Sequence, residues 1–447
     1  MDAGERERCN VTRGFVAPGT EIYWDQTIYE REMETIFGSA WLFVGHDSMI
    51  PNAGDFITNY MGNDPVIVVR DRSNTPRVYL NRCRHRGNKV CLHDSGSTKS
   101  FRCSYHGWTY GLGGELAAVP LLDKAYDADF PRGELGLVSA ARVTTYHGMI
   151  FATWKIGGPS LDDYLGEDLR WYLETFVFDD PEGLEVLPGR HRYVVPGNWK
   201  MLSENFGGDM YHFASTHASV VMLARAGQAD RIQANNDLRG DDTVYYSVEC
   251  RGDRGIPHGL VQLTCGTGTN AAEVSQAAAI SPDAVAWVRD RHQRRHRLLG
   301  DRPSEAVAFH TGTIWPNLSM NGFGAAFYAR TFLQWQPRGP EETDAWQWAF
   351  VEKSAPREVK ERMAFVLTQR QSAAGMVAPD DMDNFQRMHD VLHTTRAAKL
   401  AFNYDLGAKG KASLVPGLPG TVMEAVSERY HRSFYEYWDS VMDGSGR

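Results

Sequence analysis

The order of apolar and polar positions divides the chain into stretches of different texture. Residues 26–37 repeat apolar positions at helical spacing, with Asp25 placed to cap the helix and Gly38 placed to end it. From about 41 to 155, short runs of β-like alternation are separated by turn-forming residues. This spacing predicts a small antiparallel β domain, and the remainder of the chain mixes helices with long strands.

Individual strands can be placed from the turns that separate them. The predicted strands are 55–61, 66–70 and 78–80 in the β-like stretch, and 327–336 and 344–352 further along. Turn clusters at 62–65 and 73–76 separate the first three strands. The cluster at 337–340 makes the last two strands, which are rich in aromatic residues, a predicted hairpin.

The C-terminal segment predicts a helix that starts after the Pro- and Gly-rich residues 416–420. Thr421 and Glu424 have the spacing of a capping box. An apolar stripe at four-residue spacing then predicts a face buried in the core or in a subunit interface. The stripe comprises Val422, Val426, Tyr430, Phe434 and Trp438.

Composition narrows the class of protein. A length of 447 residues favours two domains, and 42% hydrophobic with 23% charged residues is ordinary for a globular enzyme. A net charge of −9 with no sustained basic run argues against nucleic acid or an anionic membrane as the partner. No stretch approaches the roughly 18 apolar residues of a membrane-spanning helix. Without a signal-peptide pattern at the N-terminus, we expect a cytoplasmic protein.

Two Cys-plus-His pairs form the first candidate site. Cys83 and His85 are followed by Cys103 and His106, and the six cysteines of the chain are too scattered for a disulfide framework. A Rieske [2Fe–2S] cluster takes two thiolates on one iron and two imidazoles on the other. The neutral ligands raise its potential to roughly −150 to +300 mV, against about −400 mV for an all-cysteine cluster. The pairs therefore predict this cofactor.

The alternative for the same four residues is a zinc site. Zinc fingers pair Cys with Cys and His with His, whereas here each Cys precedes a His. A chance match to the pattern is expected in roughly one chain in ten thousand of this composition. Gly87 and Gly107 follow the two pairs and would let the backbone bend around the cluster. Cys91, between the pairs, is expected to be a small buried thiol.

The second candidate site lies in residues 204–217. If 199–211 is helical, Asn205, Asp209 and His212 share one face. His212 and His217 are out of register in a regular helix, so the helix must end, kink or bulge for both to reach one metal. Gly207 and Gly208 cost a helix roughly 2 kcal/mol together, and close backbone packing against the site would justify them.

Two His and one carboxylate form the facial triad of non-haem iron(II) oxygenases. The pattern is weaker than the first one, and two structural histidines are the alternative. The carboxylate must come from elsewhere, and an acid cluster at a helix start supplies candidates in Asp380, Asp381 and Asp383. The same cluster could simply favour the helix N-terminus.

Two further His pairs have a spacing that could bind a metal. His292 and His296 lie among five arginines on a predicted helix that opens at Ser281, which indicates a solvated basic face. His389 and His393 could form a ligand pair, but structural imidazoles on a helix are the more ordinary outcome.

The two constellations, in this order, resemble the α subunits of ring-hydroxylating dioxygenases, in particular the naphthalene and biphenyl dioxygenase group. The likeness extends over nearly the whole chain. It includes residues 83–87, 103–108, 198–200, 204–212, 315–319, 351–353 and 380–384. The resemblance implies an aromatic-ring dioxygenase that carries a Rieske [2Fe–2S] cluster and a mononuclear Fe(II).

The resemblance also assigns residues by position. The iron ligands would be His212, His217 and Asp381. Phe206 matches an aromatic that lines the substrate pocket, and Gln371 stands where enzymes for polycyclic hydrocarbons tend to carry a large aromatic. A more polar or differently oriented substrate is therefore expected. No arginine stands out in the sequence as an anchor for a carboxylate, so the sequence neither supports nor excludes a benzoate-like substrate.

Asp209 would not bind metal in such an enzyme. By the resemblance it bridges the neighbouring subunit's His106 to His212, with Asn205 and Tyr105 near the junction. We therefore expect Asp209 and Asn205 to act in catalysis beside the ligands, and Asp209 to carry the electron path between subunits.

The implied fold is α+β. A β-rich Rieske domain at 41–155 follows an N-terminal helical part, 1–40, and a larger helix-grip-like catalytic domain with an antiparallel sheet occupies 156–447. The implied partners are a small β subunit in an α3β3 assembly, a ferredoxin or an NAD(P)H-dependent reductase, dioxygen and an aromatic substrate. A homotrimeric Rieske monooxygenase or demethylase is the main alternative. A pure Rieske electron carrier would leave about 300 residues without a role.

Overall fold

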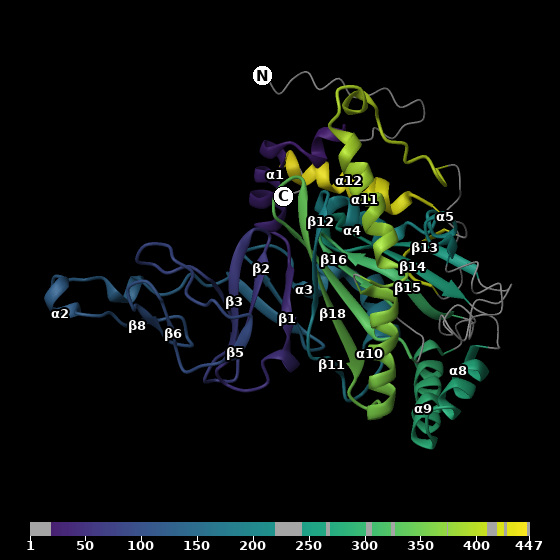
Figure 1. The fold of residues 1–447 in the computed structure, drawn as a ribbon, viewed down its shortest axis with the longest axis horizontal. Helices are drawn as coiled ribbons and strands as arrows, with labels where there is room; N and C mark the ends of the chain where they lie inside the picture. The colour runs from purple at the N-terminus through teal and green to yellow at the C-terminus, as the bar shows by residue number, and fades with distance from the viewer. Residues whose placement is uncertain are drawn as a thin grey trace. The chain divides into compact units, whose positions relative to one another are not determined.

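The computed structural model describes residues 19–219, 244–264, 269–300, 306–322, 327–372, 374–408, 418–423 and 427–444. It divides into two compact units, drawn as ribbons in Figure 1. The smaller unit is Phe37–Leu161, and the larger unit combines residues from before and after it in the sequence. In the described ranges, no helix has the length and apolarity that crossing a membrane requires.

The smaller unit is built from three small antiparallel sheets, as the alternating sequence pattern predicts. One sheet has the order β4-β3-β2-β5, a second β1-β10-β9 and a third β6-β7-β8. Their strands are β1 Leu42–His46, β2 Asp55–Met61, β3 Asp64–Arg70, β4 Pro76–Leu80, β5 Ser95–Ser97, β6 Phe101–Arg102, β7 Thr109–Tyr110, β8 Leu116–Ala118, β9 Arg142–Tyr146 and β10 Met149–Thr153. The strands predicted at 55–61, 66–70 and 78–80 are confirmed as β2, β3 and β4.

The larger unit contains a nine-stranded antiparallel sheet in the order β11-β18-β17-β16-β15-β14-β13-β19, with β12 also paired to β18. Its strands are β11 Leu184–Val186, β12 His191–Pro196, β13 Val244–Arg251, β14 Pro257–Thr264, β15 Ala306–Ile314, β16 Leu318–Asn321, β17 Arg330–Pro337, β18 Glu342–Glu352 and β19 Thr421–Met423. The predicted hairpin is confirmed as β17 and β18. The α+β fold with an antiparallel catalytic sheet is therefore as expected.

Side chains on both faces of this sheet are buried along β17 and most of β18. Helix α4, Trp199–Gly208, lies across β14 to β17 on one face. Hydroxyls of the sheet hold it there, because Thr311 and Thr313 donate to the backbone oxygens of Phe206 and Ser203. Helices α9, Pro282–Leu299, and α10, Arg357–Gln371, form an apolar cluster with Ala329, Ala349 and Val351, which the strand register places on the same face as α4. Figure 1 shows α4, α11 and α12 grouped together, away from α9.

The glycine pair in α4 allows a close approach, although of a different kind from the one expected. A Cβ on Gly207 would lie 1.9 Å from the ring of Tyr430, and a Cβ on Gly259 would lie 2.1 Å from the carbonyl oxygen of Gly207. The glycines thus let α4 pack against β14 and against α12, Arg429–Met442, rather than against the candidate metal site.

The predicted start of the C-terminal helix is wrong. Thr421 begins strand β19, which pairs with β13, and the helix α12 starts only at Arg429. Pairing to an open sheet edge satisfies more backbone groups than one helical turn would, so the capping-box pattern is overridden. Glu424 and Val426 lie outside the described residues. The rest of the stripe, Tyr430, Phe434 and Trp438, is buried in α12 as predicted.

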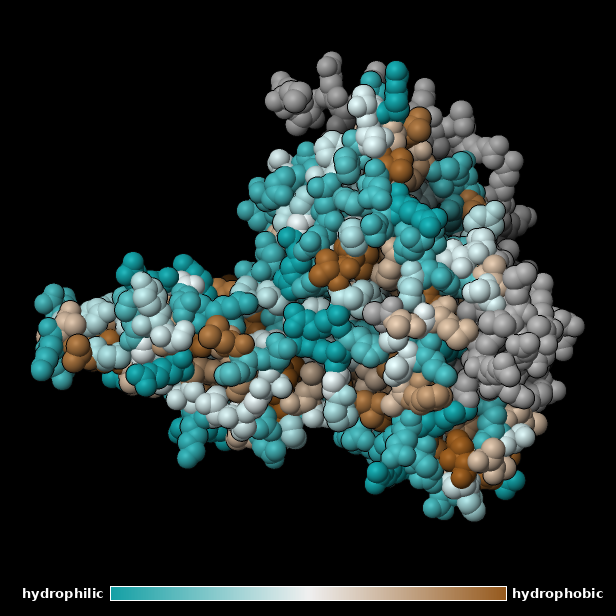
Figure 2. Space-filling view, in the orientation of Figure 1, coloured by the Kyte–Doolittle hydropathy of each residue, from teal (hydrophilic) through white to brown (hydrophobic). Residues whose placement is uncertain are grey.

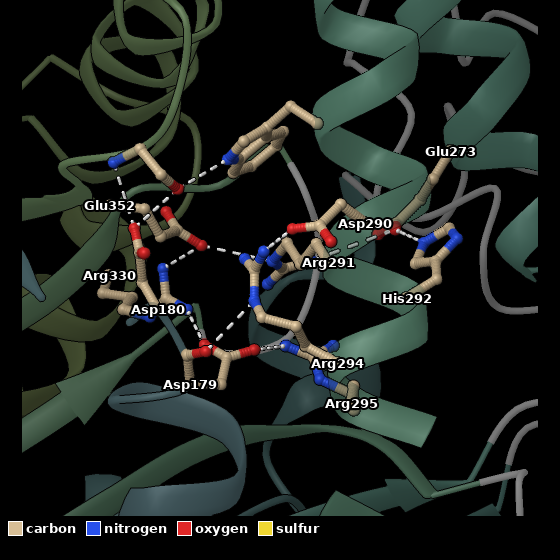
Figure 3. A network of polar contacts seen from close by, with 12 residues as sticks. Asp179, Asp180, Glu273, Asp290, Arg291, His292, Arg294, Arg295, Arg330 and Glu352 are labelled. Carbon is tan, nitrogen blue, oxygen red and sulfur yellow. Dashed lines mark hydrogen bonds and ion pairs between the residues drawn. The ribbon is translucent and has the colours of Figure 1, made fainter. Parts of the chain in front are cut away.

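The basic face expected around His292 is also wrong in part. On α9, Arg291 and Arg295 are buried rather than solvated. Figure 3 shows how carboxylates from other elements neutralise them: Arg295 and Arg330 donate to Asp179, and Arg291 donates to Glu352. His292 contacts Glu273 at 2.6 Å. This network ties α9 to the ends of β17 and β18, so it is a structural element of the fold.

The N-terminal helix, α1 Gln26–Glu32, begins as predicted, because Asp25 accepts hydrogen bonds from the backbone of Thr27 and Ile28. A π-helical turn, Met33–Phe37, continues it before Gly38. The helix delivers one buried carboxylate, Glu32, into the larger unit.

Glu32 is the centre of a fully buried polar cluster. Its carboxylate lies 2.5 Å from the ammonium of Lys200, and both side chains have 0% exposure. The indole N–H groups of Trp199 and Trp438 also donate to it, at 2.9 and 2.8 Å. Burial lowers the pKa of Lys200, and the charge of Glu32 opposes that shift. One carboxylate therefore joins α1, α4 and α12.

We expect Glu32→Gln to destabilise the larger unit by about 3–5 kcal/mol, because it leaves the charge of Lys200 buried without a counter-ion. The double variant Glu32→Gln with Lys200→Met should recover much of that loss, because neither charge remains. Differential scanning calorimetry would measure this. The exposed Glu30→Gln on the same helix is the control and should change stability by less than about 0.5 kcal/mol. A Glu32→Gln variant as stable as this control would contradict the prediction.

Candidate functional site

The two Cys-plus-His pairs occupy two loops of the smaller unit that have the same backbone hydrogen bonds. In the first loop the N–H of Gly87 donates to the carbonyl of Cys83, and the N–H of Cys83 donates to Asn88. In the second loop Gly107 donates to Cys103 and Cys103 donates to Trp108 in the same way. Both glycines have positive φ, 78° and 73°, which only glycine adopts without strain. The two loops therefore hold their Cys and His side chains in equivalent ways.

The side chains of these loops converge. Cys83 and Cys103 are buried and are not joined in a disulfide. The rings of His85 and His106 lie 4.5 Å apart, and Trp108 stacks on His85 at 4.9 Å. Nδ1 of His85 is buried with no hydrogen-bond partner among the described residues. A buried imidazole nitrogen without a partner raises the free energy of the folded state unless it binds a metal or another group. The two thiols and two imidazoles therefore fit a [2Fe–2S] cluster.

Hydrogen-bond donors surround the two sulfurs. Burial would raise the pKa of Cys103, but the backbone N–H groups of Tyr105 and His106 and the amide of Asn88 lower it. The hydroxyl of Tyr110 lies 3.2 Å from Sγ of Cys83, and the backbone N–H of Arg84 donates to that hydroxyl at 2.9 Å. The hydroxyl oxygen of Tyr110 thus accepts a hydrogen bond from Arg84, and its hydroxyl proton can be donated to the sulfur of Cys83. Cys91 is a buried thiol, as predicted.

In the larger unit, α4 ends before the His residues are reached. The helix stops at Gly208, a turn follows, and the short helix α5, Phe213–Thr216, separates His212 from His217. This interruption is the helix end that the sequence required, so Asn205 and Asp209 do not share one continuous helix with His212. It brings the two imidazole rings to 5.3 Å, centre to centre.

The third member of this cluster comes from the helix α11, Ala378–Leu392. Asp381 lies in its first turn, and its Oδ1 is 3.3 Å from Nε2 of His212 and 3.2 Å from Nε2 of His217. His217 and Asp381 are buried, with side-chain exposures of 3% and 8%. Burial would raise the pKa of Asp381, but hydrogen bonds from the two imidazoles lower it. Two imidazole nitrogens and one carboxylate therefore point at a common centre, which is a donor set that suits Fe(II).

Each imidazole has a second carboxylate behind it. Nδ1 of His212 is 3.3 Å from Oδ2 of Asp209, and Nδ1 of His217 is 3.4 Å from Oδ2 of Asp380. A carboxylate at Nδ1 fixes the tautomer that leaves Nε2 available for a metal. Burial would lower the pKa of His212, but Asp209 and Asp381 raise it to about 10. The geometry thus separates the roles of the adjacent Asp380 and Asp381, which spacing in the sequence could not do.

Two hollows meet at the cluster. A narrow cavity of about 40 Å³ lies on one side, lined by Phe206, His217, Arg370, Gln371 and Asp381 among others. A cavity of this volume has room for a water molecule or two, so a ring must displace side chains to enter. On the other side a hollow of about 640 Å³ reaches Asn205 and Asp209.

The wider hollow has apolar side chains on its rim. Met388 and Val391 of α11 line it and are exposed. Apolar residues otherwise form small separate patches on the face shown in Figure 2, which is mostly hydrophilic.

One further cluster in the described ranges could hold a metal. It contains Glu341, His389 and His393. The second His pair noted in the sequence therefore belongs to a different cluster from His212. Its members are more exposed than His217 and Asp381, with Glu341 at 47% and His393 at 44%. Exposed groups of this kind are common without a metal, and the buried triad has the stronger claim.

Comparison with known proteins gives the family. A model described as ring hydroxylating alpha subunit (catalytic domain) matches residues 182–444, and a Rieske [2Fe-2S] domain model matches residues 40–146. The chain belongs to the ring-hydroxylating α-subunit family. It is therefore a Rieske non-haem iron oxygenase, and its cofactors are a Rieske [2Fe–2S] cluster and a mononuclear iron. The family match favours an oxygenase over a pure electron carrier.

Curated relatives of this family cover almost the whole chain. The biphenyl 2,3-dioxygenase subunit alpha of Rhodococcus jostii (strain RHA1) is 36% identical over 99% of this chain and 92% of its own length. The large oxygenase component of the naphthalene 1,2-dioxygenase system of Pseudomonas fluorescens is 32% identical over 95% and 91%. A solved naphthalene 1,2-dioxygenase with indole in its active site is 30% identical over 95% and 92%, with a TM-score of 0.80.

The roles of three residues at these sites do not follow from the sequence. Asp380 is one of several acids in its cluster, and only the contact with Nδ1 of His217 distinguishes it. Arg370 and Tyr110 gave no signal, because neither lies in a recognisable motif. Their positions depend on which elements pack against them.

We expect Tyr110→Phe to lower the midpoint potential of the cluster, because the lost hydrogen bond stabilises the more negative reduced form. A differential effect of about 1 kcal/mol corresponds to roughly 40 mV for one electron. Redox titration followed by electron paramagnetic resonance would measure it. Tyr79→Phe is the matched control, because Tyr79 is buried in the same core and donates to the carbonyl of Leu112 instead. Equal potentials in the two variants would refute the role of Tyr110.

Proposed function

We propose that this chain is the terminal oxygenase subunit that cis-dihydroxylates an aromatic ring. The proposal rests on the cluster of His212, His217 and Asp381, whose metal-binding atoms lie close together beside a cavity lined by Phe206. The reaction joins the arene, dioxygen, two electrons and two protons to give one cis-dihydrodiol, with both oxygen atoms in the product. The bound iron supplies dioxygen activation, and the protein supplies ligands, orientation and an enclosed site.

In this proposal, Cys83, His85, Cys103 and His106 hold the cluster. His212, His217 and Asp381 hold the iron, while Asp209 and Asp380 keep the two imidazoles in the correct tautomer. Asn205 lies beside that ring, with its side-chain amide 3.5 Å from Nδ1 of His212. The open side of the triad faces the cavity that contains Phe206 and Gln371.

Electrons must reach the iron from a cluster. We propose that the wider hollow beside Asp209 receives the cluster-bearing unit of a second copy of this chain. The carboxylate of Asp209 is 32% exposed, so it can accept an N–H from the neighbouring subunit's His106 while it still contacts His212. Exposed Met388 and Val391 on the rim would be covered by the same contact.

The proposed partners follow from the role of a terminal oxygenase. A relative is named as the large oxygenase component of a 2,4-dinitrotoluene dioxygenase system, which indicates additional components in that system. For this chain we propose a reductase that takes electrons from NAD(P)H, with or without a ferredoxin, and a small β subunit in an α3β3 assembly. Co-purification with a small subunit would separate this arrangement from a homotrimeric monooxygenase or demethylase.

The purified chain should contain three irons, two with acid-labile sulfide and one without. His217→Ala should lose the third iron and all oxygenation but keep the visible spectrum of the cluster, because a triad offers only three protein ligands. Metal analysis and absorption spectroscopy would measure both. His389→Ala is the control and should retain three irons. Stoichiometric zinc, or full iron content in His217→Ala, would contradict the assignment.

Asp209→Asn should retain both iron centres but pass electrons from the reduced cluster orders of magnitude more slowly. The amide keeps the size of the side chain, yet it presents a donor where an acceptor is needed. A single-turnover measurement with pre-reduced protein would follow cluster oxidation and product yield together. Asp383→Asn on α11, where Asp383 makes an exposed ion pair with Arg387, is the control and should behave as wild type. Near-normal cluster oxidation in Asp209→Asn would exclude the bridging role.

A further inference from the structure

A buried arginine lines the narrow cavity beside the candidate iron site. Arg370 is in the last turn of α10, next to Gln371, and has an exposure of 5%. It shares the cavity with Phe206, His217 and Asp381. The packing of α10 against the sheet therefore places a permanent cation within reach of a bound substrate.

Arg370 has no counter-charge in the described part of the chain. Its Nε and Nη1 are buried without a hydrogen-bond partner, and no ion pair is formed with a described carboxylate. Its contact is with the ring of Tyr328, whose centroid lies 5.0 Å from the guanidinium carbon. A ring face attracts a cation but does not accept the N–H hydrogen bonds of a guanidinium.

The buried arginines of α9 and β17 show what a structural role requires in this protein. Arg291, Arg295 and Arg330 are equally buried, and each is paired with Asp179 or Glu352. A buried charge without such a partner is unfavourable, because burial removes its hydration and nothing replaces it. Arg370 departs from this pattern, because its guanidinium lines the cavity and has no carboxylate partner among the described residues.

We propose that Arg370 binds a carboxylate substituent of the aromatic substrate. A carboxylate is the group that a guanidinium recognises best, since it supplies both charge and acceptor oxygens. Held there, the substituent would fix which ring edge faces the triad and so determine which carbon atoms are oxidised. The buried Gln371, in place of a large aromatic, leaves a polar side chain beside the same substituent. This inference rests on the proposed function, because it assigns the substrate class of that site.

The test compares naphthalene-2-carboxylate with naphthalene-2-carboxamide, which has nearly the same shape but no charge. Isothermal titration of the iron-loaded protein, without reductant, gives both dissociation constants. We expect wild type to bind the carboxylate at least about tenfold more tightly, as a hydrogen bond to a charged group provides. Arg370→Met should abolish that preference, and Arg370→Lys should keep part of it.

Arg357→Met is the matched control, because Arg357 is exposed at the other end of α10. It should show the wild-type preference. A wild-type protein that binds both probes with similar affinity would overturn the proposal, and so would an Arg370→Met variant that loses affinity for both probes equally. The wild-type comparison stands even if the Met variant does not fold. Because binding is measured without turnover, failure of the anchor is distinguishable from absence of oxygenase activity.

Discussion

The ion pair of Glu32 with Lys200 is the contact on which the catalytic unit depends. It lies where α1, α4 and α12 meet, and the indoles of Trp199 and Trp438 complete its hydrogen bonds. A buried charge pair is intolerant of displacement, since moving either partner leaves an uncompensated charge. The pair therefore fixes the start of α4 against two other helices. At the far end of the same helix, the chain turns at Gly208 and presents Asp209 and His212.

The candidate iron site follows from where helices end and begin. The C-terminal end of α4 releases His212 and His217 from helical register, and the first turn of α11 brings Asp381 to both imidazoles. Each imidazole then has one carboxylate at Nε2 and another at Nδ1. This arrangement orients the rings before any metal binds, which is how surrounding carboxylates tune a metal centre. In the proposed function, the two hollows serve as separate routes, one for a substrate and one for an electron donor.

Buried arginines in this protein have two different fates. Those on α9 and β17 are neutralised by Asp179 and Glu352 and hold the sheet and helix together. Arg370 has the same burial but faces a cavity rather than a carboxylate. In the proposal, the carboxylate of a bound ligand takes the place of the missing counter-ion. A nearby carboxylate thus distinguishes the arginines that stabilise the fold from the one that we propose binds a ligand.

The sequence by itself determined the elements whose signals are local. Strands such as Asp55–Met61, the cap at Asp25 and the two Cys-plus-His loops depend on residues close together along the chain. Only tertiary structure decided the rest. Thr421 joined a sheet edge instead of starting a helix, Asp380 and Asp381 acquired different partners, and the arginines of α9 became buried. Each of these outcomes depends on groups that are far apart in the sequence. The local sequence around a charged residue therefore does not show whether that residue will be buried beside a counter-ion or beside a cavity.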